Sequence, residues 1–322
     1  GLSGGGWEEK AKRAKLWGPG TIPGEASITP GVQPVSISSP CAVVLGTAQD
    51  GGHPQAGCKA TCCNNPGALE AGPLYSSALA ICDPATRQSW IIDCTPAFPQ
   101  QLALLEKAVP LKDTPGFLLT HAHIGHYTGL IHLGREVLDA DGVEVYALEG
   151  MKAFLESNLP WEELVTEKNI KLRSASPDQA LDLSPSIRVT PHLVPHRDEY
   201  SETACFRIDG PRRSLLWLPD VDAWEDMNPG IEELIRDVDI AFLDGTFFNA
   251  EELPGRDISS IAHPFIEDSI RRFSGLPVVE REKIRFIHLN HSNPAIQPAS
   301  MAAEKIEQAG HSIARQGDLI EL

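Results

Sequence analysis

The 322-residue chain is 42% hydrophobic, which is enough for the core of one large domain or two small ones. Its formal net charge of −17 and its pI near 5.0 argue against nucleic acid or an anionic membrane surface as the main partner, because both are polyanions. The chain has no run of about 18 apolar residues, so we expect no transmembrane helix and no membrane partner.

The chain has seven cysteines, an odd number, and three of them lie in one short segment. This pattern favours metal ligation over a framework of disulfides, although it does not exclude export. The sequence starts at Gly1 rather than at a methionine. The localisation therefore stays open between a cytoplasmic protein and an exported one whose leader has been removed.

Residues 1–38 are rich in Gly, Pro and Ser, with one short charged stretch at 7–16 that could form a turn or two of helix. We expect these residues to form a partly irregular extension. From residue 39 the pattern changes to alternating apolar runs and turns, so we expect a single domain over 39–322.

The first apolar run, residues 42–46, predicts a strand, and a long turn-rich loop follows it. Cys58, Cys62 and Cys63 lie in that loop, where the backbone can fold around one ion. Three thiolates are good ligands for a tetrahedral structural zinc. The alternatives are a buried apolar cluster or a disulfide between two of the three.

Further apolar runs and helical spacings continue this pattern through the first half of the chain. They predict strands at 76–82, 89–94, 117–119 and 143–147, and helices at 97–109, 128–138 and 149–156. Residues 157–185 are polar and less periodic, and we expect them to form an excursion or lid over the site.

Three histidines, His121, His123 and His126, follow the strand predicted at 117–119. His121 and His123 are two residues apart in extended chain and can project to one side toward a shared ion. Any single histidine is more often a surface or core residue. Three of them at the carboxyl end of a strand are hard to explain by packing, so this segment predicts a metal site.

The second half of the chain supplies further candidate ligands at predicted strand ends. His196 closes the segment 186–196 and is the candidate third imidazole, whereas His192 lies inside it and is expected to be structural. Asp220 follows the strand at 214–218, where the alternative is an ordinary turn or helix N-cap aspartate. The remaining predicted elements are strands at 203–208, 240–246, 284–290, 313–315 and 319–322 and a helix at 299–309.

With these residues assembled, the chain resembles the metallo-β-lactamase superfamily, whose fold is a four-layer αββα sandwich of the α/β class. Within it, the chain looks most like the pyrroloquinoline-quinone biosynthesis protein B family and the related phosphodiesterases of phosphonate breakdown. The resemblance runs from about Val43 to the end of the chain. It rests on VLGTAQDGGHPQAGC at 44–58, THAHIGHYTGL at 120–130, LPD at 218–220, FLDGTF at 242–247 and IHLNHSNPAI at 287–296.

The superfamily motif is His-x-His-x-Asp-His, and the resemblance implies a role for each matching residue. His121, His123 and His196 would hold a first metal ion, Asp220 would bridge, and His126 with His288 would hold a second ion. This chain has Gly125 where the motif has an aspartate ligand of the second ion. We therefore expect a complete first site and a defective second one.

The relatives also carry a structural zinc on three cysteines and a histidine that follows the last active-site histidine by three residues. His291 stands at that place and would complete a Cys3His site with Cys58, Cys62 and Cys63. The usual spacing is Cys-x-Cys-x-x-Cys, whereas this chain has Cys-x-x-x-Cys-Cys. The spacing therefore leaves open whether Cys62, Cys63 or both of them bind the zinc.

The resemblance implies hydrolysis of an ester or phosphodiester in a small-molecule substrate. A metal held by three imidazoles and a carboxylate lowers the pKa of its bound water, so that hydroxide is available to attack. We expect Asp220 and His263 to be catalytic, with His263 as general acid where relatives place a histidine near the leaving group. The alternative for His263 is a residue at a helix N-terminus ahead of Pro264.

Two other functions stay open. Ligation by three histidines and an aspartate suits zinc, iron and manganese alike, and a single iron with open positions can bind dioxygen. The resemblance to the quinone-biosynthesis family supports such an oxygenase or hydroxylase, although that family departs at the first histidine and keeps the aspartate. A third alternative is a non-catalytic relative that only binds metal. The oligomeric state is not visible in the sequence.

Overall fold

The computed structural model describes residues 38–64, 72–258 and 261–322. The chain divides after Val35, and every described residue belongs to the second unit, Ser36–Leu322. The extension predicted at 1–38, including the helical stretch at 7–16, lies outside the described residues except for residue 38. Everything below concerns the second unit.

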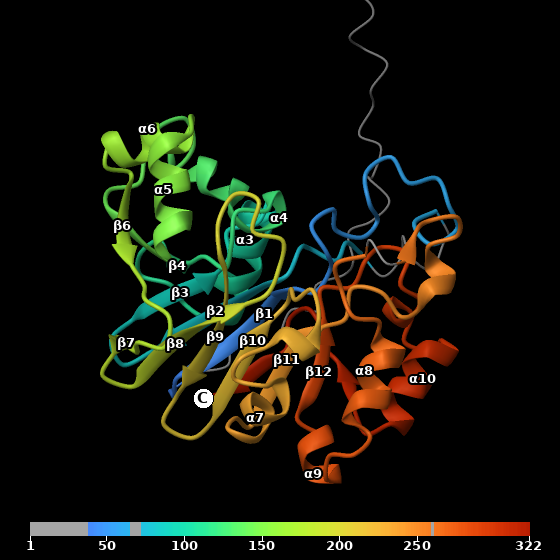
Figure 1. Cartoon of the computed structure of the whole chain (residues 1–322). Helices are drawn as coiled ribbons and strands as arrows, with labels where there is room; N and C mark the ends of the chain where they lie inside the picture. Colours follow the sequence, from blue (N-terminus) through green and yellow to red (C-terminus); the bar gives the residue numbers. More distant parts are fainter. Residues whose placement is uncertain (1–37, 65–71, 259–260) are drawn as a thin grey trace, which may run out of the picture. The chain divides into compact units, whose positions relative to one another are not determined.

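The described residues form two seven-stranded sheets (Figure 1). The first has the order β14-β1-β2-β3-β4-β5-β6, with β1 (Cys41–Gly46), β2 (Ala78–Asp83), β3 (Gln88–Ile92), β4 (Gly116–Leu118), β5 (Val143–Ala147), β6 (Ile170–Ser174) and β14 (Leu319–Glu321). The second has the order β13-β12-β11-β10-β9-β8-β7, with β7 (Leu181–Ser184), β8 (Ile187–Val194), β9 (Thr203–Asp209), β10 (Ser214–Leu218), β11 (Ile240–Asp244), β12 (Ile284–Ile287) and β13 (Ser312–Ile313). Strands β3 to β6 pair in parallel, and so do β10 to β13.

The two sheets pack face to face, and side-chain alternation along β1 shows how. Ala42 and Val44 join a buried cluster with Phe206 and Trp217 of the second sheet. Their neighbours Cys41, Val43 and Leu45 point to the other face and join the cluster beneath the first group of helices. Because both faces of the strand are buried, its sequence is a continuous apolar run and does not alternate between apolar and polar residues.

Helices cover the outer face of each sheet (Figure 1). The first sheet carries α3 (Phe98–Ala108), α5 (Glu149–Ser157) and α6 (Trp161–Thr166), and the second carries α7 (Ile231–Arg236), α8 (Ile266–Phe273) and α10 (Met301–Gln308). Shorter helices are α4 (Ile124–Tyr127) and α9 (Val278–Arg281), with 3-10 turns η2 (Thr128–Leu133), η3 (Trp224–Asp226), η4 (Ala250–Glu252) and η6 (Pro294–Ile296). The predicted four-layer αββα sandwich is confirmed.

The prediction of a helix at 128–138 is wrong. The chain instead forms the four-residue helix α4 and then η2, which ends at Gly134 in an extended conformation. Gly129 donates its amide hydrogen to the carbonyl of Cys94, so the segment is fixed to the loop after β3 rather than to its own preceding turn. The apolar spacing there reflects packing of Leu130 and Leu133 in the core, not a long helix.

The lid predicted at 157–185 is also wrong, because these residues form α6, β6 and β7. Strands β6 and β7 are the outermost strands at one end of their respective sheets. Edge strands often have polar residues on their exposed side. In β6, Lys171 is exposed, whereas its neighbours Ile170 and Leu172 are buried or partly buried. The polarity that suggested a lid is that of edge strands.

Among the described helices, none is long and apolar enough to cross a membrane.

Candidate metal centre

The candidate site lies where strands of both sheets end. His121 and His123 follow β4, His196 follows β8, Asp220 follows β10, and His288 comes directly after β12. His288 has a left-handed backbone, with φ of 63°, which a non-glycine residue adopts only when its surroundings enforce it. All of these side chains except that of His123 are buried. The predicted residues therefore converge from both sheets on one edge of the sandwich.

The first group of donors is His121, His123 and His196. The Nε2 atom of His121 is 2.8 Å from Nδ1 of His123. The Nε2 atom of His196 is 3.3 Å from the same Nδ1, and the ligand atoms of all three lie within 4.8 Å of one another. These spacings suit three nitrogens around one ion.

The second group is His126 and His288, and the carboxylate of Asp220 lies between the two groups. Its Oδ2 atom is 3.2 Å from Nε2 of His126 and 3.3 Å from Nε2 of His288. Its Oδ1 atom is 3.6 Å from Nε2 of His196. Each carboxylate oxygen thus faces one set of histidines, as a bridging ligand does.

Two buried atoms in this centre lack a hydrogen-bond partner among the described residues, namely Oδ2 of Asp220 and Nε2 of His288. An unsatisfied buried polar group costs about 1–3 kcal/mol, so a folded protein retains one only for a reason. Both atoms are good ligands for a metal ion, and both point at the same space. The residues present fit a metal cofactor.

The structure places a further carboxylate here, that of Asp50, which the sequence analysis missed. Its Oδ1 atom is 3.5 Å from Nε2 of both His126 and His288. The second donor group therefore contains Asp50, His126 and His288. The expectation of a defective second site took account only of Gly125, whereas the structure places the carboxylate of Asp50 beside the same two histidines.

The second ring nitrogen of each histidine is also held. Oδ2 of Asp93 lies 2.7 Å from Nδ1 of His126, and Oδ1 of Asp222 lies 2.9 Å from Nδ1 of His196. The other partners are Thr120 Oγ1 for His121 Nδ1, Thr246 Oγ1 for His288 Nδ1 and Glu199 Oε2 for His123 Nε2. Such partners fix the tautomer and the orientation of a metal-binding ring.

The electrostatics of the centre suit a cation. Burial lowers the pKa of His121 well below its ordinary value, so this imidazole is neutral. Burial opposes ionisation of Asp220, yet His288 and His126 hold the pKa of its carboxyl group well below its usual range. A neutral imidazole and an ionised carboxylate are the forms that bind a metal.

His263, the predicted general acid, lies beside this centre. Its Nδ1 atom is 2.7 Å from Oδ2 of Asp244 and 4.0 Å from Oδ1 of Asp220. It precedes α8, which begins at Ile266, so it is not a residue of that helix. Asp244 thus holds Nδ1 and not Nε2. His192, expected to be structural, lies within β8, and its Nδ1 atom is 2.7 Å from Oδ1 of Asp178.

The three cysteines and His291 meet as a separate group. Cys58 and Cys62 have their Sγ atoms 3.7 Å apart, and Nδ1 of His291 is 3.5 Å from Sγ of Cys62 and 3.4 Å from Sγ of Cys63. A tetrahedral zinc with Zn–S bonds of about 2.3 Å separates its sulfur ligands by roughly 3.8 Å. Both adjacent cysteines therefore reach the site.

The pKa of Cys62 shows what an ion would have to compensate in this group. Burial, together with hydrogen bonding and charge from the neighbouring thiols Cys58 and Cys63, raises the pKa of Cys62 to about 12. Three thiolates can then stand side by side near neutral pH only when a cation compensates their charge. The donor set and its spacing fit a structural zinc.

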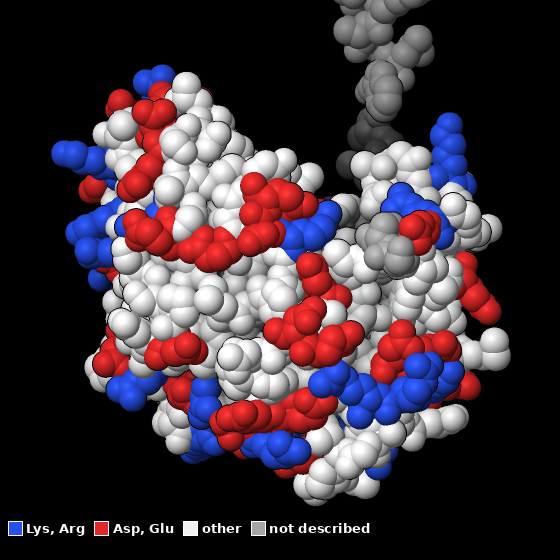
Figure 2. Space-filling model, viewed as in Figure 1, with Lys and Arg blue, Asp and Glu red and all other residues white. Residues whose placement is uncertain are grey.

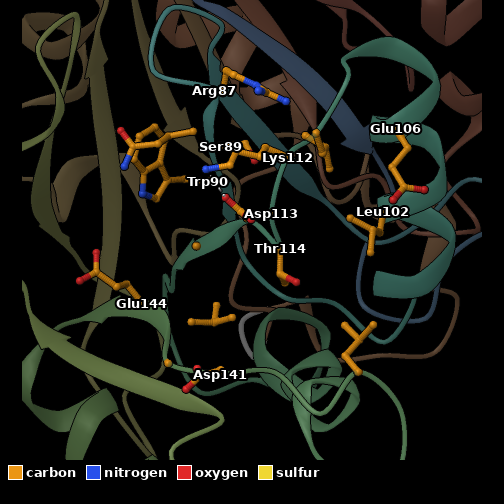
Figure 3. A pocket seen from close by; sticks show the side chains of 16 residues that line it. Arg87, Ser89, Trp90, Leu102, Glu106, Lys112, Asp113, Thr114, Asp141 and Glu144 are labelled. Carbon is orange, nitrogen blue, oxygen red and sulfur yellow. Dashed lines mark ion pairs between the residues drawn. The ribbon is translucent and has the colours of Figure 1, made fainter.

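A hollow of about 700 Å³ lies elsewhere, at the opposite end of the first sheet (Figure 3). Gln88, Gly116 and Val143 line it, and these are the first residues of β3, β4 and β5. Its labelled charged side chains are of both signs, including Arg87, Glu106, Lys112, Asp113, Asp141 and Glu144. None of the predicted site residues lines it, so this hollow is separate from the candidate metal centre.

Known proteins resemble this chain over most of its length. A curated relative, the coenzyme PQQ synthesis protein B of Xanthomonas axonopodis pv. citri (strain 306), is 25% identical and covers 85% of this chain and 97% of its own. The crystal structure of zinc-bound PqqB from Methylobacterium extorquens is similar, with a TM-score of 0.73, 21% identity, and coverage of 88% and 100%. A diphosphatase from the PhnP family has a TM-score of 0.64, 21% identity, and coverage of 88% and 97%.

The two families inferred from the motifs are thus both found among the relatives, which confirms the resemblance. The likeness to the solved structures shows the fold, since each is less than 25% identical. Residues 89–306 match the family described as the beta-lactamase superfamily domain, and this range includes every candidate ligand of the histidine centre except Asp50. The chain therefore belongs to the β-lactamase superfamily.

Proposed function

We propose that this protein is a metal-dependent hydrolase that uses two ions to cleave an ester, with phosphodiesters as the preferred substrate class. The observation that carries the proposal is the position of Asp220. One oxygen of its carboxylate faces His196 of the first donor group, and the other faces His126 and His288 of the second. A bridging carboxylate of this kind holds two ions close enough to act on one reacting phosphate or carbonyl group.

The protein's own residues have separate tasks in this proposal. Two ions, when bound, acidify a water molecule and withdraw charge from the substrate's phosphoryl or carbonyl oxygen. The three histidines of the first group and the pair in the second orient those ions, and Asp93 and Asp222 hold two of the rings in place. His263, fixed through Nδ1 by Asp244, donates a proton from Nε2 to the departing oxygen.

Zinc is the ion we propose for the cysteine site, and zinc, iron or manganese for the histidine centre. Sulfur-rich tetrahedral donor sets favour zinc, whereas imidazole and carboxylate together suit all three metals. The zinc-bound PqqB structure is a relative that holds zinc. The superfamily consists mostly of metal-dependent hydrolases, which supports hydrolysis over oxygen chemistry.

A small molecule is the proposed substrate rather than a nucleic acid. On the face shown in Figure 2, groups of Asp and Glu side chains alternate with groups of Lys and Arg side chains, and no basic band crosses the face. Together with the net charge of −17, this surface would repel a long polyanion. A single phosphodiester would instead be drawn in by the ions of the centre.

The test of the proposed function is an assay of protein loaded separately with zinc, manganese and iron. The substrates are bis(p-nitrophenyl) phosphate, p-nitrophenyl phosphate and p-nitrophenyl acetate, and the measurement is release of p-nitrophenol. We expect the diester to be cleaved fastest, and His121→Ala to lower that rate by more than about a hundredfold, because it removes a proposed ligand.

Asp268→Asn is the control and should keep the wild-type rate. Asp268 is half exposed on α8, and its ion pair is with Arg271 of the same helix. No release of p-nitrophenol by fully loaded protein would contradict the proposal. Iron-dependent consumption of dioxygen without hydrolysis would favour the oxygenase, an alternative suggested by the curated relatives named coenzyme PQQ synthesis protein B.

The general-acid role of His263 gives a separate prediction. A general acid speeds reactions by about 10²–10⁴-fold when the leaving group is basic, but p-nitrophenolate departs readily without a proton. We expect His263→Gln to slow hydrolysis of a phenyl diester about a hundredfold and that of the p-nitrophenyl diester much less. Equal losses for both substrates would mean that His263 only positions its neighbours or binds metal.

A further inference from the structure

Gly125 leaves a space in the second donor group, and Asp50 fills it. A Cβ atom built on Gly125 would lie 2.5 Å from both Cγ and Oδ1 of Asp50, and 2.8 Å from its Cα. A Cβ atom does not approach non-bonded atoms this closely, so any side chain at position 125 and the observed position of Asp50 exclude each other. A side chain at position 125 would need the space that the side chain of Asp50 fills, although the two positions are far apart in sequence.

The carboxylate of Asp50 divides its two oxygens between two tasks. Oδ2 accepts a hydrogen bond from the amide of Gly125 at 3.3 Å. Oδ1 is turned toward the centre, at 3.5 Å from Nε2 of both His126 and His288. One oxygen is thus bound to the backbone of the residue that has no side chain, and the other faces His126 and His288.

The loop that carries Asp50 is anchored beside His288. Ala48 forms isolated β-bridges with Ser76 and with Leu289, the residue that follows His288. The amide of Gln49 donates to the carbonyl of Leu289 at 2.9 Å, and Ser76 donates its hydroxyl hydrogen to the backbone carbonyl of Asp50 at 2.9 Å. These bonds hold the backbone of Asp50 independently of its side chain, so its position does not depend on a bound ion.

A buried atom points to what this arrangement binds. Nε2 of His288 lies in a side chain that is only 1% exposed, and it has no hydrogen-bond partner among the described residues. Asp50 is close to it but not placed to satisfy it by a hydrogen bond. The group of Asp50, His126 and His288, with Oδ2 of Asp220, offers two nitrogens and two oxygens around one space.

We propose that Asp50 is a ligand of the second ion and replaces, from the loop after β1, the carboxylate that the histidine segment lacks at Gly125. The inference rests on the proposed two-ion function of the same site and names the residue that makes the second position complete. Gly125 is then a compensating residue, because only glycine leaves room for Asp50. A substitution at either position alone should damage the second site. Exchanging both should restore it in part, because the Cβ atom at position 125 still lies 2.8 Å from Cα of residue 50 and the loop after β1 must shift.

The experiment is to measure metal content, by elemental analysis and by equilibrium dialysis against zinc, in the full chain and three variants. The variants are Asp50→Asn, Gly125→Asp and the double variant Asp50→Gly/Gly125→Asp. We expect three ions per wild-type chain, one at the cysteines and two at the histidine centre. Asp50→Asn should weaken the affinity for one ion by more than about tenfold, Gly125→Asp should lose that ion, and the double variant should bind it more tightly than Gly125→Asp does.

Asp268→Asn makes the same chemical change at an exposed position and should keep three ions. Circular dichroism and the thermal midpoint show whether each variant is folded. Asp50→Asn preserves the shape of the side chain, so this variant should fold even if the double variant does not. Cobalt substitution gives a second readout, since loss of one oxygen ligand should change the absorption of the ion at that position.

Metal content keeps this inference separate from the proposed function. If Asp50→Asn keeps all three ions with unchanged affinity and cobalt spectrum, the inference is overturned, whatever the hydrolytic rate. If the wild-type chain binds only two ions and Asp50→Asn also binds two, it is overturned as well. If the third ion depends on Asp50 and yet no substrate is hydrolysed, Asp50 is a ligand and the proposed function fails instead.

Discussion

Asp220→Asn is expected to lower the rate of diester hydrolysis by more than about a hundredfold, and to release at least one ion from the histidine centre. Losing a residue that only orients a metal ligand costs about 10–100-fold, and Asp220 is proposed as a ligand of both ions. The asparagine keeps the size of the side chain but loses its charge. It also presents NH₂ to one of the two histidine groups that now face an oxygen.

The measurements are kcat/KM for bis(p-nitrophenyl) phosphate and the number of ions per chain. Asp268→Asn, which replaces an exposed carboxylate on α8, should change neither. Because Asp220 is buried, the thermal midpoint of the variant must be measured too, so that loss of folding is not mistaken for loss of chemistry. A folded Asp220→Asn variant with wild-type ion content and rate would contradict the bridging role.

Removal of the cysteine site should destabilise the protein. His291→Ala and Cys62→Ser are each expected to lose one zinc and to lower the thermal midpoint. Zinc held at a thousand times its dissociation constant stabilises the folded state by about 4 kcal/mol. The site joins the loop that contains Cys58 to the segment after β12, so its loss frees both segments.

The control for this experiment is Cys205→Ala, because Cys205 is a buried thiol in β9 outside the cysteine cluster. It should keep the full zinc content even if it costs some stability through the cavity it leaves. The ions of the histidine centre should remain in His291→Ala. If both His291→Ala and Cys62→Ser keep their zinc and their thermal midpoint, the cysteine cluster is not a structural zinc site.

The sequence by itself determined the strands that carry the site, because a buried strand needs a run of apolar residues and leaves a readable pattern. Residues 143–147 and 214–218 were predicted with the bounds that the structure has for β5 and β10. The histidines His121, His123 and His126 were recognisable because they are adjacent in the chain. Where several ligands belong to one short segment, their spacing is itself the signal.

The sequence pattern was misleading where local spacing has more than one physical cause. Leu130 and Leu133 have helical spacing, yet they belong to a 3-10 turn that packs into the core. The polar stretch after residue 157 was mistaken for a lid because an edge strand such as β6 is exposed on one side and polar there. Neither error moved a candidate ligand, because the ligands lie at strand ends that were predicted.

Only the tertiary structure decided which carboxylates serve the histidines. Asp93 and Asp244 stand at or just after strand ends, a signal that was present but was not used for them. Asp222 and Asp50 lie in loops of ordinary turn composition, where aspartate is common for local reasons. Nothing in their own neighbourhood distinguishes them.

The exchange between Asp50 and Gly125 shows why. The two residues are 75 positions apart. They meet because Asp50 follows β1 and Gly125 follows β4 of the same sheet, and the bridge between Ala48 and Leu289 also brings Asp50 beside His288 of the other sheet. From the sequence, the glycine at 125 indicated a lost ligand. A motif records which residues stand next to each other along the chain, whereas a metal ion is bound by whatever the fold brings within a few ångströms.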